Sequence, residues 1–256
     1  MTILRVLDIE TTGEDPEMGA EIVELGWTDV RRTTSKDEND EPYFGGEILA
    51  PVTTSKLYHT HKPSPPEVLA VHHIQFWESA PNPMFGWGAA ESDMSVINGR
   101  KPEYYVAHNA DFERKFLHQF KLPWICTYKA ALRVWPDAPR HSNQTLKYFL
   151  HLEDELDESL CHPPHRAGPD AYVTAAILTK LLEKASIEDL LQWTNEPRLL
   201  PKCPIGDKQG HKGKPWSEVD MGFLDWMVNK APDMDADFKW NAQHELDRRR
   251  TLQLQG

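Results

Sequence analysis

The chain has 256 residues, of which 39% are hydrophobic, so it can form one sizeable domain with its own core and a smaller module. It carries 28 Lys and Arg against 40 Asp and Glu, a formal net charge of −12, which argues against a protein that coats nucleic acid through bulk positive charge. Its three cysteines lack Cys-x-x-Cys spacing, which argues against a disulfide framework or a structural zinc site and predicts a cytoplasmic protein. The charged residues near its start predict no signal peptide.

The first stretch predicts a buried strand that carries two acids near its end. Five of the seven residues before Glu10 are aliphatic, and the run breaks at Thr11-Thr12-Gly13. Residues two apart on a strand share a face, so Asp8 and Glu10 project side by side, about 6–7 Å apart along the backbone. Such a pair is costly to bury unless a cation neutralises it, and its oxygen ligands suit Mg²⁺ or Mn²⁺. The alternative is a frayed strand end with two solvated acids, and these residues alone leave both open.

Two more strands are predicted at 20–30 and 43–49, with a polar hairpin connection over 31–42. Three strands in succession predict an antiparallel meander. Ser64 is the expected N-cap of a helix that reaches the pair His72-His73. Residues 81–102, rich in Pro, Gly and small side chains, are predicted to form a loop region.

The second half predicts strands that alternate with helices. A buried strand at 104–107 precedes a helix that Asn109 can cap, and a strand at 124–126 follows. Further helices are expected at 128–135, 143–150 and 168–183. This alternation predicts an α/β domain over 1–190. Residues 186–204 are expected to form a connection, within which 191–203 are the linker between the two domains. Residues 204–256 are expected to form a small α+β module, with a basic hairpin tip at 206–214.

Three motifs in this order resemble those of the DEDD-type 3′→5′ exonucleases with a catalytic histidine (DEDDh). They are Asp8-Ile9-Glu10-Thr11-Thr12-Gly13, His108-Asn109-Ala110-x-Phe112 and His165-Arg166-Ala167-Gly168-Pro169-Asp170. The segment 124–136 and the stretch from Gly213 to Trp226 resemble the exodeoxyribonuclease X family, so the resemblance covers most of the chain. It implies an RNase H-like mixed sheet flanked by helices.

The resemblance also implies an activity and a set of site residues. The enzyme would be a metal-dependent exodeoxyribonuclease that releases nucleoside 5′-monophosphates from DNA 3′ ends. Asp8, Glu10, Glu113 and Asp170 would hold two Mg²⁺ or Mn²⁺ ions. His165 would be the general base, since an ordinary histidine pKa of about 6.5 suits that task at neutral pH.

Four further residues are substrate-binding candidates. Thr11 and Thr12 would hold the terminal 3′-hydroxyl, His73 would lie near the terminal base, and Arg166 would contact a phosphate. Each has a plainer alternative: turn chemistry for the threonines, a helix-end histidine for His73 and a solvated helix face for Arg166.

The second motif departs from the family pattern, which has Asp where this chain has Glu113, while Asp111 occupies a variable position. Helical spacing separates the two acids. Phe116 and Leu117, three and four residues after Glu113, are apolar, whereas the corresponding residues after Asp111 are Arg114 and Lys115. Glu113 is therefore expected to point toward the sheet and Asp111 to lie in the first helical turn, where the macrodipole favours an acid.

The expected partner is DNA, as a single strand or at a duplex 3′ end, and Lys208, Lys212 and Lys214 are expected to help engage it. An exoribonuclease that trims RNA 3′ ends is an alternative, and a non-catalytic nucleic-acid-binding scaffold is another. No membrane contact is expected, because no stretch approaches the length of a membrane span. The oligomeric state is left open, a homodimer included.

Overall fold

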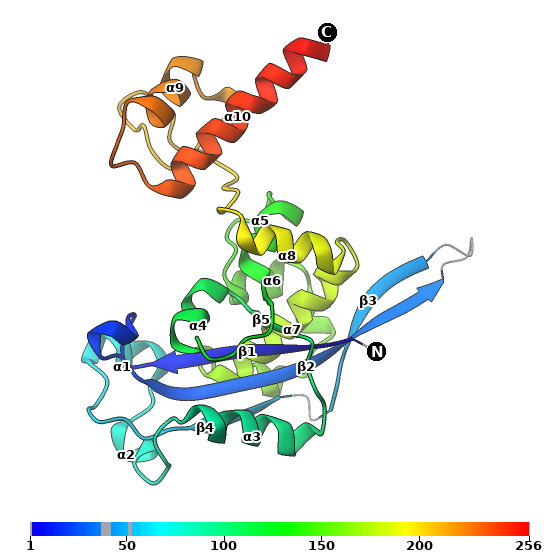
Figure 1. The fold of residues 1–256 in the computed structure, drawn as a ribbon, viewed down its shortest axis with the longest axis vertical. Helices are drawn as coiled ribbons and strands as arrows, with labels where there is room; N and C mark the ends of the chain where they lie inside the picture. Colours follow the sequence, from blue (N-terminus) through cyan, green and yellow to red (C-terminus); the bar gives the residue numbers. More distant parts are fainter. Residues whose placement is uncertain (1, 37–41, 51–52, 256) are drawn as a thin grey trace.

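The computed structural model describes residues 2–36, 42–50 and 53–255. Its centre is a mixed sheet of six strands in which β3, β2, β1, β5 and β6 follow one another and β4 also pairs with β2 (Figure 1). The strands are β1 (Ile3–Thr11), β2 (Ile22–Lys36), β3 (Pro42–Ile48), β4 (Thr54–Leu57), β5 (Tyr104–Ala107) and β6 (Trp124–Cys126). The predicted α/β architecture is confirmed.

Strand β1 lies in the middle of the sheet, antiparallel to β2 and parallel to β5. The meander predicted for the first three strands is present, since β2 is antiparallel to both β1 and β3. Leu4, Val6 and Leu7 have no exposed surface, as expected for a strand covered on both faces.

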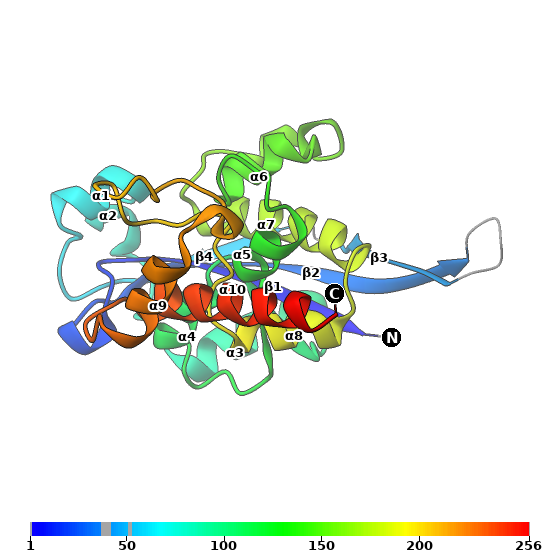
Figure 2. The same cartoon turned by 90° about the horizontal axis from the view of Figure 1, so that it is seen from above.

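The β2–β3 hairpin extends beyond the body of the molecule as an arm (Figures 1 and 2). The connection predicted over 31–42 is wrong for residues 31–36, which continue β2 and pair with β3 in the register Arg32↔Gly46 and Thr34↔Phe44. Polar residues can form these strands because the pairing uses backbone groups and β-branched threonines favour extended backbone. The remaining predicted connection, 37–41, lies outside the described residues.

Ten α-helices and four 3₁₀ segments occur in the described part of the chain. They are η1 (Pro16–Met18), α1 (Pro66–His72), α2 (Phe76–Ser79), α3 (Trp87–Asn98), α4 (Ala110–Phe116), α5 (Thr127–Val134), α6 (Asn143–Phe149), η2 (Leu152–Asp154), η3 (Glu158–Cys161), α7 (Ala167–Leu182), α8 (Ile187–Asn195), η4 (Trp216–Glu218), α9 (Met221–Asn229) and α10 (Ala236–Gln255).

Three local predictions are wrong. The loop region expected over 81–102 contains α3, which buries Ala90 and Met94, four residues apart, against the sheet. The connection expected from 186 contains α8, which starts with a capping box between Ser186 and Asp189. The N-cap position of α1 is Pro65 rather than Ser64.

The two faces of β1 belong to different cores. Leu4 and Val6 pack in the core that contains α7, whereas Leu7 and Ile9 pack in the core that contains Ala90 of α3 and Phe116 of α4. Because side chains alternate along a strand, Asp8 and Glu10 project on the α7 side.

A third core contains only residues of the C-terminal part: Cys203, Trp216, Val219, Leu224, Met227, Ala242 and Leu246. The β content there is a single bridge between Lys202 and Pro215. This part lies beyond α5 and α8 in Figure 1. It is joined to the segment after α8 by the Arg198 N–H donating to Asp237 (2.9 Å) and the Asn241 amide donating to the Arg198 carbonyl (2.7 Å). The domain boundaries remain a prediction. Within the described residues, no helix is both long enough and apolar enough to cross a bilayer.

Candidate active site

Two acids of β1 meet a third acid, far away in the sequence on α7, on the α7 side of the sheet. One carboxylate oxygen each from Asp8 and Glu10 of β1 and from Asp170 of α7 lies within 4.8 Å of the others. Asp8 and Glu10 are half-buried, and Asp170 is 8% exposed. Oxygen ligands at this spacing can hold a divalent cation.

Gly26 sets the distance between α7 and the sheet. It pairs with Asp8 across β1 and β2, and the start of α7 lies directly on it. A Cβ on Gly26 would stand 2.1 Å from the carbonyl carbon of Ala167 and 2.4 Å from the nitrogen of Gly168. Only a residue without a side chain permits this approach, which brings Asp170, three residues further along α7, to the acids of β1.

The carboxylate of Asp170 is oriented by two donors. Its Oδ2 accepts the His165 backbone N–H (2.9 Å), and its Oδ1 accepts the Gln144 amide (3.2 Å). His165 has left-handed backbone (φ 60°), and its side chain is exposed. The backbone of His165 is therefore tied to an acid of the cluster, while its ring is accessible to solvent.

Burial and mutual repulsion raise the pKa of each acid of the cluster. Burial, followed by the charges of Asp170, Glu10 and Glu113, raises the pKa of Asp8 well above its usual range. Burial and then Asp170 raise the pKa of Glu10 to about 8, and burial also raises the pKa of Asp170. A divalent cation would remove this repulsion, so the residues present fit a metal site.

Glu113 lies close to this cluster but outside the tight group of three. It is 5% exposed on α4, burial raises its pKa to about 8, and its charge contributes to the raised pKa of Asp8 and Glu10. Its Oε2 has no hydrogen-bond partner among the described residues. A buried oxygen without a partner calls for an explanation, and an unfilled cation position beside it is one.

Asp111 faces the other way. Its side chain is 54% exposed, and its carboxylate lies 2.9 Å from the Lys129 ammonium and 3.7 Å from Arg114. The orientations predicted from helical spacing for Glu113 and Asp111 are thus confirmed. The role of Glu113 as a ligand stays a prediction.

His108 of the second motif has a structural position. Its Nε2 lies 2.6 Å from the His141 carbonyl and its Nδ1 2.9 Å from the Thr127 hydroxyl. Burial lowers the pKa of His108 to about 4, so the ring is neutral at neutral pH. These contacts hold the end of β5 in place. The helix that carries Glu113, α4, begins shortly after it.

The sequence patterns did not reveal Glu24. This residue of β2 is 1% exposed and accepts two hydrogen bonds from the Arg166 guanidinium (2.8 and 3.0 Å) and one from the Ala167 N–H (3.0 Å). It pairs with Glu10 in the sheet, and its charge contributes to raising the pKa of Glu10. The sequence signal that could have identified Glu24 is its position as the single acid within the apolar run 22–27.

The other substrate-binding candidates make local contacts. The Thr11 hydroxyl donates to the Gly13 carbonyl (2.6 Å), and the Thr12 hydroxyl accepts the Glu21 N–H (2.9 Å). His73 ends α1 with left-handed backbone and is exposed, whereas His72 beside it is buried. Turn chemistry thus accounts for both threonines, and the substrate contacts of Thr11, Thr12 and His73 stay predictions.

Comparison with known proteins found relatives but no matching protein-family model. Exodeoxyribonuclease 10 of Escherichia coli K12 is 30% identical over 247 residues, which cover 96% of this chain and 99% of that protein. The structure of exonuclease X in complex with 5′ overhanging duplex DNA has a TM-score of 0.52 at 28% identity, covering 75% of this chain and 99% of the other.

The nuclease domain of 3′hExo, a DEDDh family member bound to rAMP, has a TM-score of 0.50 at 16% identity and covers 72% of this chain and 92% of the other. At that identity the likeness concerns the fold alone. Together with the exonuclease X likeness it confirms the predicted RNase H-like mixed sheet flanked by helices.

Proposed function

Because this chain belongs to the exodeoxyribonuclease X family of DEDDh exonucleases, we propose that it hydrolyses DNA from the 3′ end and releases nucleoside 5′-monophosphates. The convergence of Asp8, Glu10 and Asp170 carries this proposal, since it supplies a charged centre for phosphodiester chemistry. DNA as the substrate is supported by the name of the E. coli relative and by the duplex in the exonuclease X complex.

We propose that Asp8, Glu10, Glu113 and Asp170 hold two Mg²⁺ or Mn²⁺ ions. The oxygen spacing within the first three, the unpartnered Oε2 of Glu113 and the raised pKa values of the acids support this assignment. When bound, the ions would polarise the scissile phosphate and stabilise the charge on the leaving 3′-oxygen.

His165 would accept a proton from the attacking water. The water oxygen forms a bond to phosphorus as the P–O3′ bond breaks, which leaves a 3′-hydroxyl on the shortened strand and a 5′-phosphate on the released nucleoside. The exposed ring can reach a water beside the acids, because the hydrogen bond from its backbone N–H to Asp170 keeps it next to them.

The remaining candidates would position the substrate. Thr12 accepts a hydrogen bond from Glu21, so its own hydroxyl hydrogen is available to the terminal 3′-hydroxyl, and the Thr11 oxygen retains accepting capacity. Arg166 is held by Glu24 yet its side chain stays 29% exposed, enough to contact a phosphate. His73 is exposed at the end of α1, where a terminal base could contact it.

We also propose that residues 204–256 form a separate module that binds the polynucleotide through Lys208, Lys212 and Lys214. All three are exposed in a loop that bends at Gly206, Gly210 and Gly213, each with left-handed backbone. Lys212 pairs with Asp207 in the same loop (3.1 Å).

The test of the proposed function uses 3′-labelled DNA and RNA of one sequence with Mg²⁺ or Mn²⁺. We expect metal-dependent release of labelled 5′-monophosphate from DNA, abolished in Asp8→Asn. Faster release from RNA would favour the exoribonuclease alternative, and binding without hydrolysis would favour the scaffold. The intact set of acids argues against the scaffold.

A further inference from the structure

A groove in the C-terminal part of the chain is lined mostly by apolar and aromatic side chains, and we call it the C-terminal groove. Its volume is about 460 Å³, within the ~300–1,000 Å³ typical of small-ligand pockets. The lining comprises Ile205, Trp226, Lys230, Ala231, Pro232, Asp233, Met234, Asp235 and Phe238.

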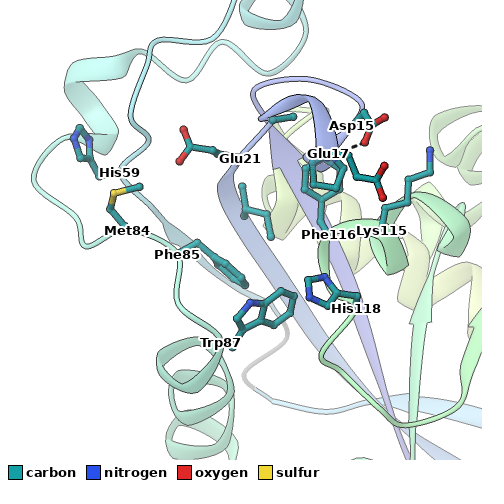
Figure 3. Close-up of a pocket in the computed structure, with 13 residues that line it drawn as sticks. Asp15, Glu17, Glu21, His59, Met84, Phe85, Trp87, Lys115, Phe116 and His118 are labelled. Atoms are coloured by element: carbon teal, nitrogen blue, oxygen red, sulfur yellow. Dashed lines mark hydrogen bonds between the residues drawn. The ribbon is translucent and has the colours of Figure 1, made fainter.

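The C-terminal groove is separate from the cavity shown in Figure 3. That cavity, of about 810 Å³, lies beside the end of β1, since Ile22 in its lining pairs with Thr11. No residue after His118 lines it, whereas the C-terminal groove contains only residues from Ile205 onward. Neither the four acids nor His165 lines the groove. A ligand of the C-terminal groove therefore contacts none of the residues proposed for catalysis.

Three aromatic rings of the module are in contact, and the last of them lines the groove. The ring centroids of His211 and Phe223 are 4.6 Å apart, and Phe223 stacks on Trp226 at 5.4 Å with 26° between the ring planes. Trp226 is 41% exposed, and neither Phe223 nor His211 lines the groove. Phe223 thus supports one side of the Trp226 ring, while another side is open to the groove. Exposed aromatic rings of this kind bind unpaired nucleobases by stacking.

The basic loop 206–214 is built against the same rings. It carries three lysines and one aspartate, a local charge of +2 in a chain whose net charge is −12. Gly206 has left-handed backbone, and a Cβ there would stand 2.9 Å from the Phe223 ring and 3.0 Å from the Cβ of His211. The His211 N–H donates to the Gly206 carbonyl (2.9 Å), which closes the loop. The loop is therefore held beside the rings, where its lysines can contact the phosphates of a strand stacked on Trp226.

The charged residues of the groove suit a base better than a phosphate. Asp233 and Asp235 line it together with Lys230. Asp235 also accepts the N–H groups of Asp237 and Phe238 (2.9 and 3.2 Å) at the start of α10. Carboxylates repel phosphates but accept hydrogen bonds from the amino groups of bases. The groove thus offers a place for a base, and the basic loop offers one for phosphates.

We propose that the C-terminal groove binds one unpaired base of single-stranded DNA, stacked on Trp226, with the adjoining phosphates at the lysines of the loop 206–214. The inference rests on the proposed binding of DNA by this module and identifies where a base is held. A single strand is favoured because neighbouring bases cover both faces of every base inside a duplex. Lysine contacts alone would hold a single strand and a duplex in the same way, because they reach only phosphates.

Binding of DNA to the full chain in EDTA tests the inference without hydrolysis. The probes are a 5′-fluorescein-labelled single strand of about 12 nucleotides and the blunt duplex of the same sequence, measured by fluorescence anisotropy. Trp226→Leu keeps an apolar side chain but removes the π-face. The Kd of this variant for the single strand should rise about ten-fold, while its Kd for the duplex stays unchanged. Trp226→Tyr keeps an aromatic ring and should retain most of the affinity.

Controls separate the stacked base from the fold and from the phosphate contacts. Trp77→Leu should bind the single strand as wild type does, since Trp77 is 71% exposed on α2 and does not line the groove. Thermal unfolding of Trp226→Leu should stay close to that of wild type, because Trp226 is not part of the third core. Lys208→Glu combined with Lys214→Glu should weaken binding of the single strand and of the duplex alike.

Four outcomes would overturn the inference. Wild type may bind no single strand, or Trp226→Leu may bind it as wild type does while the lysine variant loses affinity, which would leave phosphate contacts as the only binding by the module. An equal loss on single strand and duplex in Trp226→Leu would mean that no base stacks there. Sedimentation of wild type as a dimer and of Trp226→Leu as a monomer would show that a second copy of the chain covers the groove. Absence of 3′-label release from wild type, in contrast, would contradict the proposed hydrolysis and not the binding of a base.

Discussion

Gly26 of β2 and Ala167 of α7 are in backbone contact: a Cβ built on the glycine would stand 2.1 Å from the carbonyl carbon and oxygen of Ala167. This contact joins the strand beside Asp8 to the helix that carries Asp170. The distance between the acids is therefore set by a residue that has no functional group.

Gly26→Ala should push α7 away from the sheet and separate Asp170 from the β1 acids. We expect a loss of about 1–3 kcal/mol in the free energy of unfolding, as for other overpacked sites, and a hydrolysis rate reduced by at least about 100-fold. Chemical denaturation and 3′-label release measure the two effects. Gly88→Ala is the control, because nothing lies within 4 Å of the position that its Cβ would take and helical Ala is favoured over Gly. Unchanged hydrolysis in Gly26→Ala would contradict the geometric role of this contact.

Glu113→Gln should lower the activity far more than Asp111→Asn. Glu113 is buried with an unpartnered oxygen, so its amide variant should lose metal binding and about 100-fold or more in kcat/KM. Asp111 is 54% exposed and pairs with exposed Arg114 and with buried Lys129, whose ammonium also donates to the Thr194 carbonyl, so its amide variant should stay within a few-fold of wild type. The two variants are compared by measuring their activity at increasing concentrations of Mg²⁺ and of Mn²⁺. The reverse ranking would show that Asp111 completes the site.

The stability of the metal-free protein should fall as the pH rises from about 4.5 to 8. The pKa of Glu10 and that of Glu113 are each about 8 in the folded chain and 4.5 in the reference state, so within this window the folded protein binds protons that the unfolded chain has released. Each carboxyl then costs up to about 1.4 kcal/mol per pH unit.

Thermal unfolding at pH 5.5, 6.5, 7.5 and 8.5, in EDTA and in Mg²⁺, checks this prediction. The increase in Tm produced by Mg²⁺ should grow with pH, because the cation competes with protons for the same oxygens. Glu113→Gln should have the shallower pH dependence in EDTA. A Mg²⁺ effect that is equal at all four pH values would argue against these acids as ligands.

His165→Gln should lower kcat by about 10²–10⁴-fold while leaving the Mg²⁺ dependence of Tm unchanged. The side chain is exposed, and only its backbone contacts Asp170, so the acids should keep their arrangement. His162→Gln, an exposed neighbour that pairs with Glu158, is the control and should retain kcat.

Lys208→Glu combined with Lys214→Glu should raise KM for long DNA several-fold and leave hydrolysis of a dinucleotide unchanged. Both lysines are exposed in the proposed module, whose core contains no residue of the acid cluster, so we expect them to contact only an extended strand. The salt dependence of KM for long DNA should become less steep in the double variant. Equal losses on long DNA and dinucleotide would instead indicate damage to the active site.

The sequence alone determined the features that depend on local spacing. Alternation along β1 predicted that Asp8 and Glu10 share a face, and the helical period separated buried Glu113 from exposed Asp111. The ordered motifs predicted the family and the α/β fold, both of which the relatives confirm.

Only the tertiary structure decided the features that depend on contacts between distant segments. The Glu24–Arg166 ion pair and the contact between Gly26 and Ala167 each join residues far apart in the chain. The family resemblance implied that Asp170 belongs with the β1 acids, but only the fold brings their oxygens together. Local periodicity shows which face of an element is buried but not what packs against it. The approach of α7 to β2 at Gly26 supplies that information, because it places Asp170 against β1 and Arg166 against Glu24.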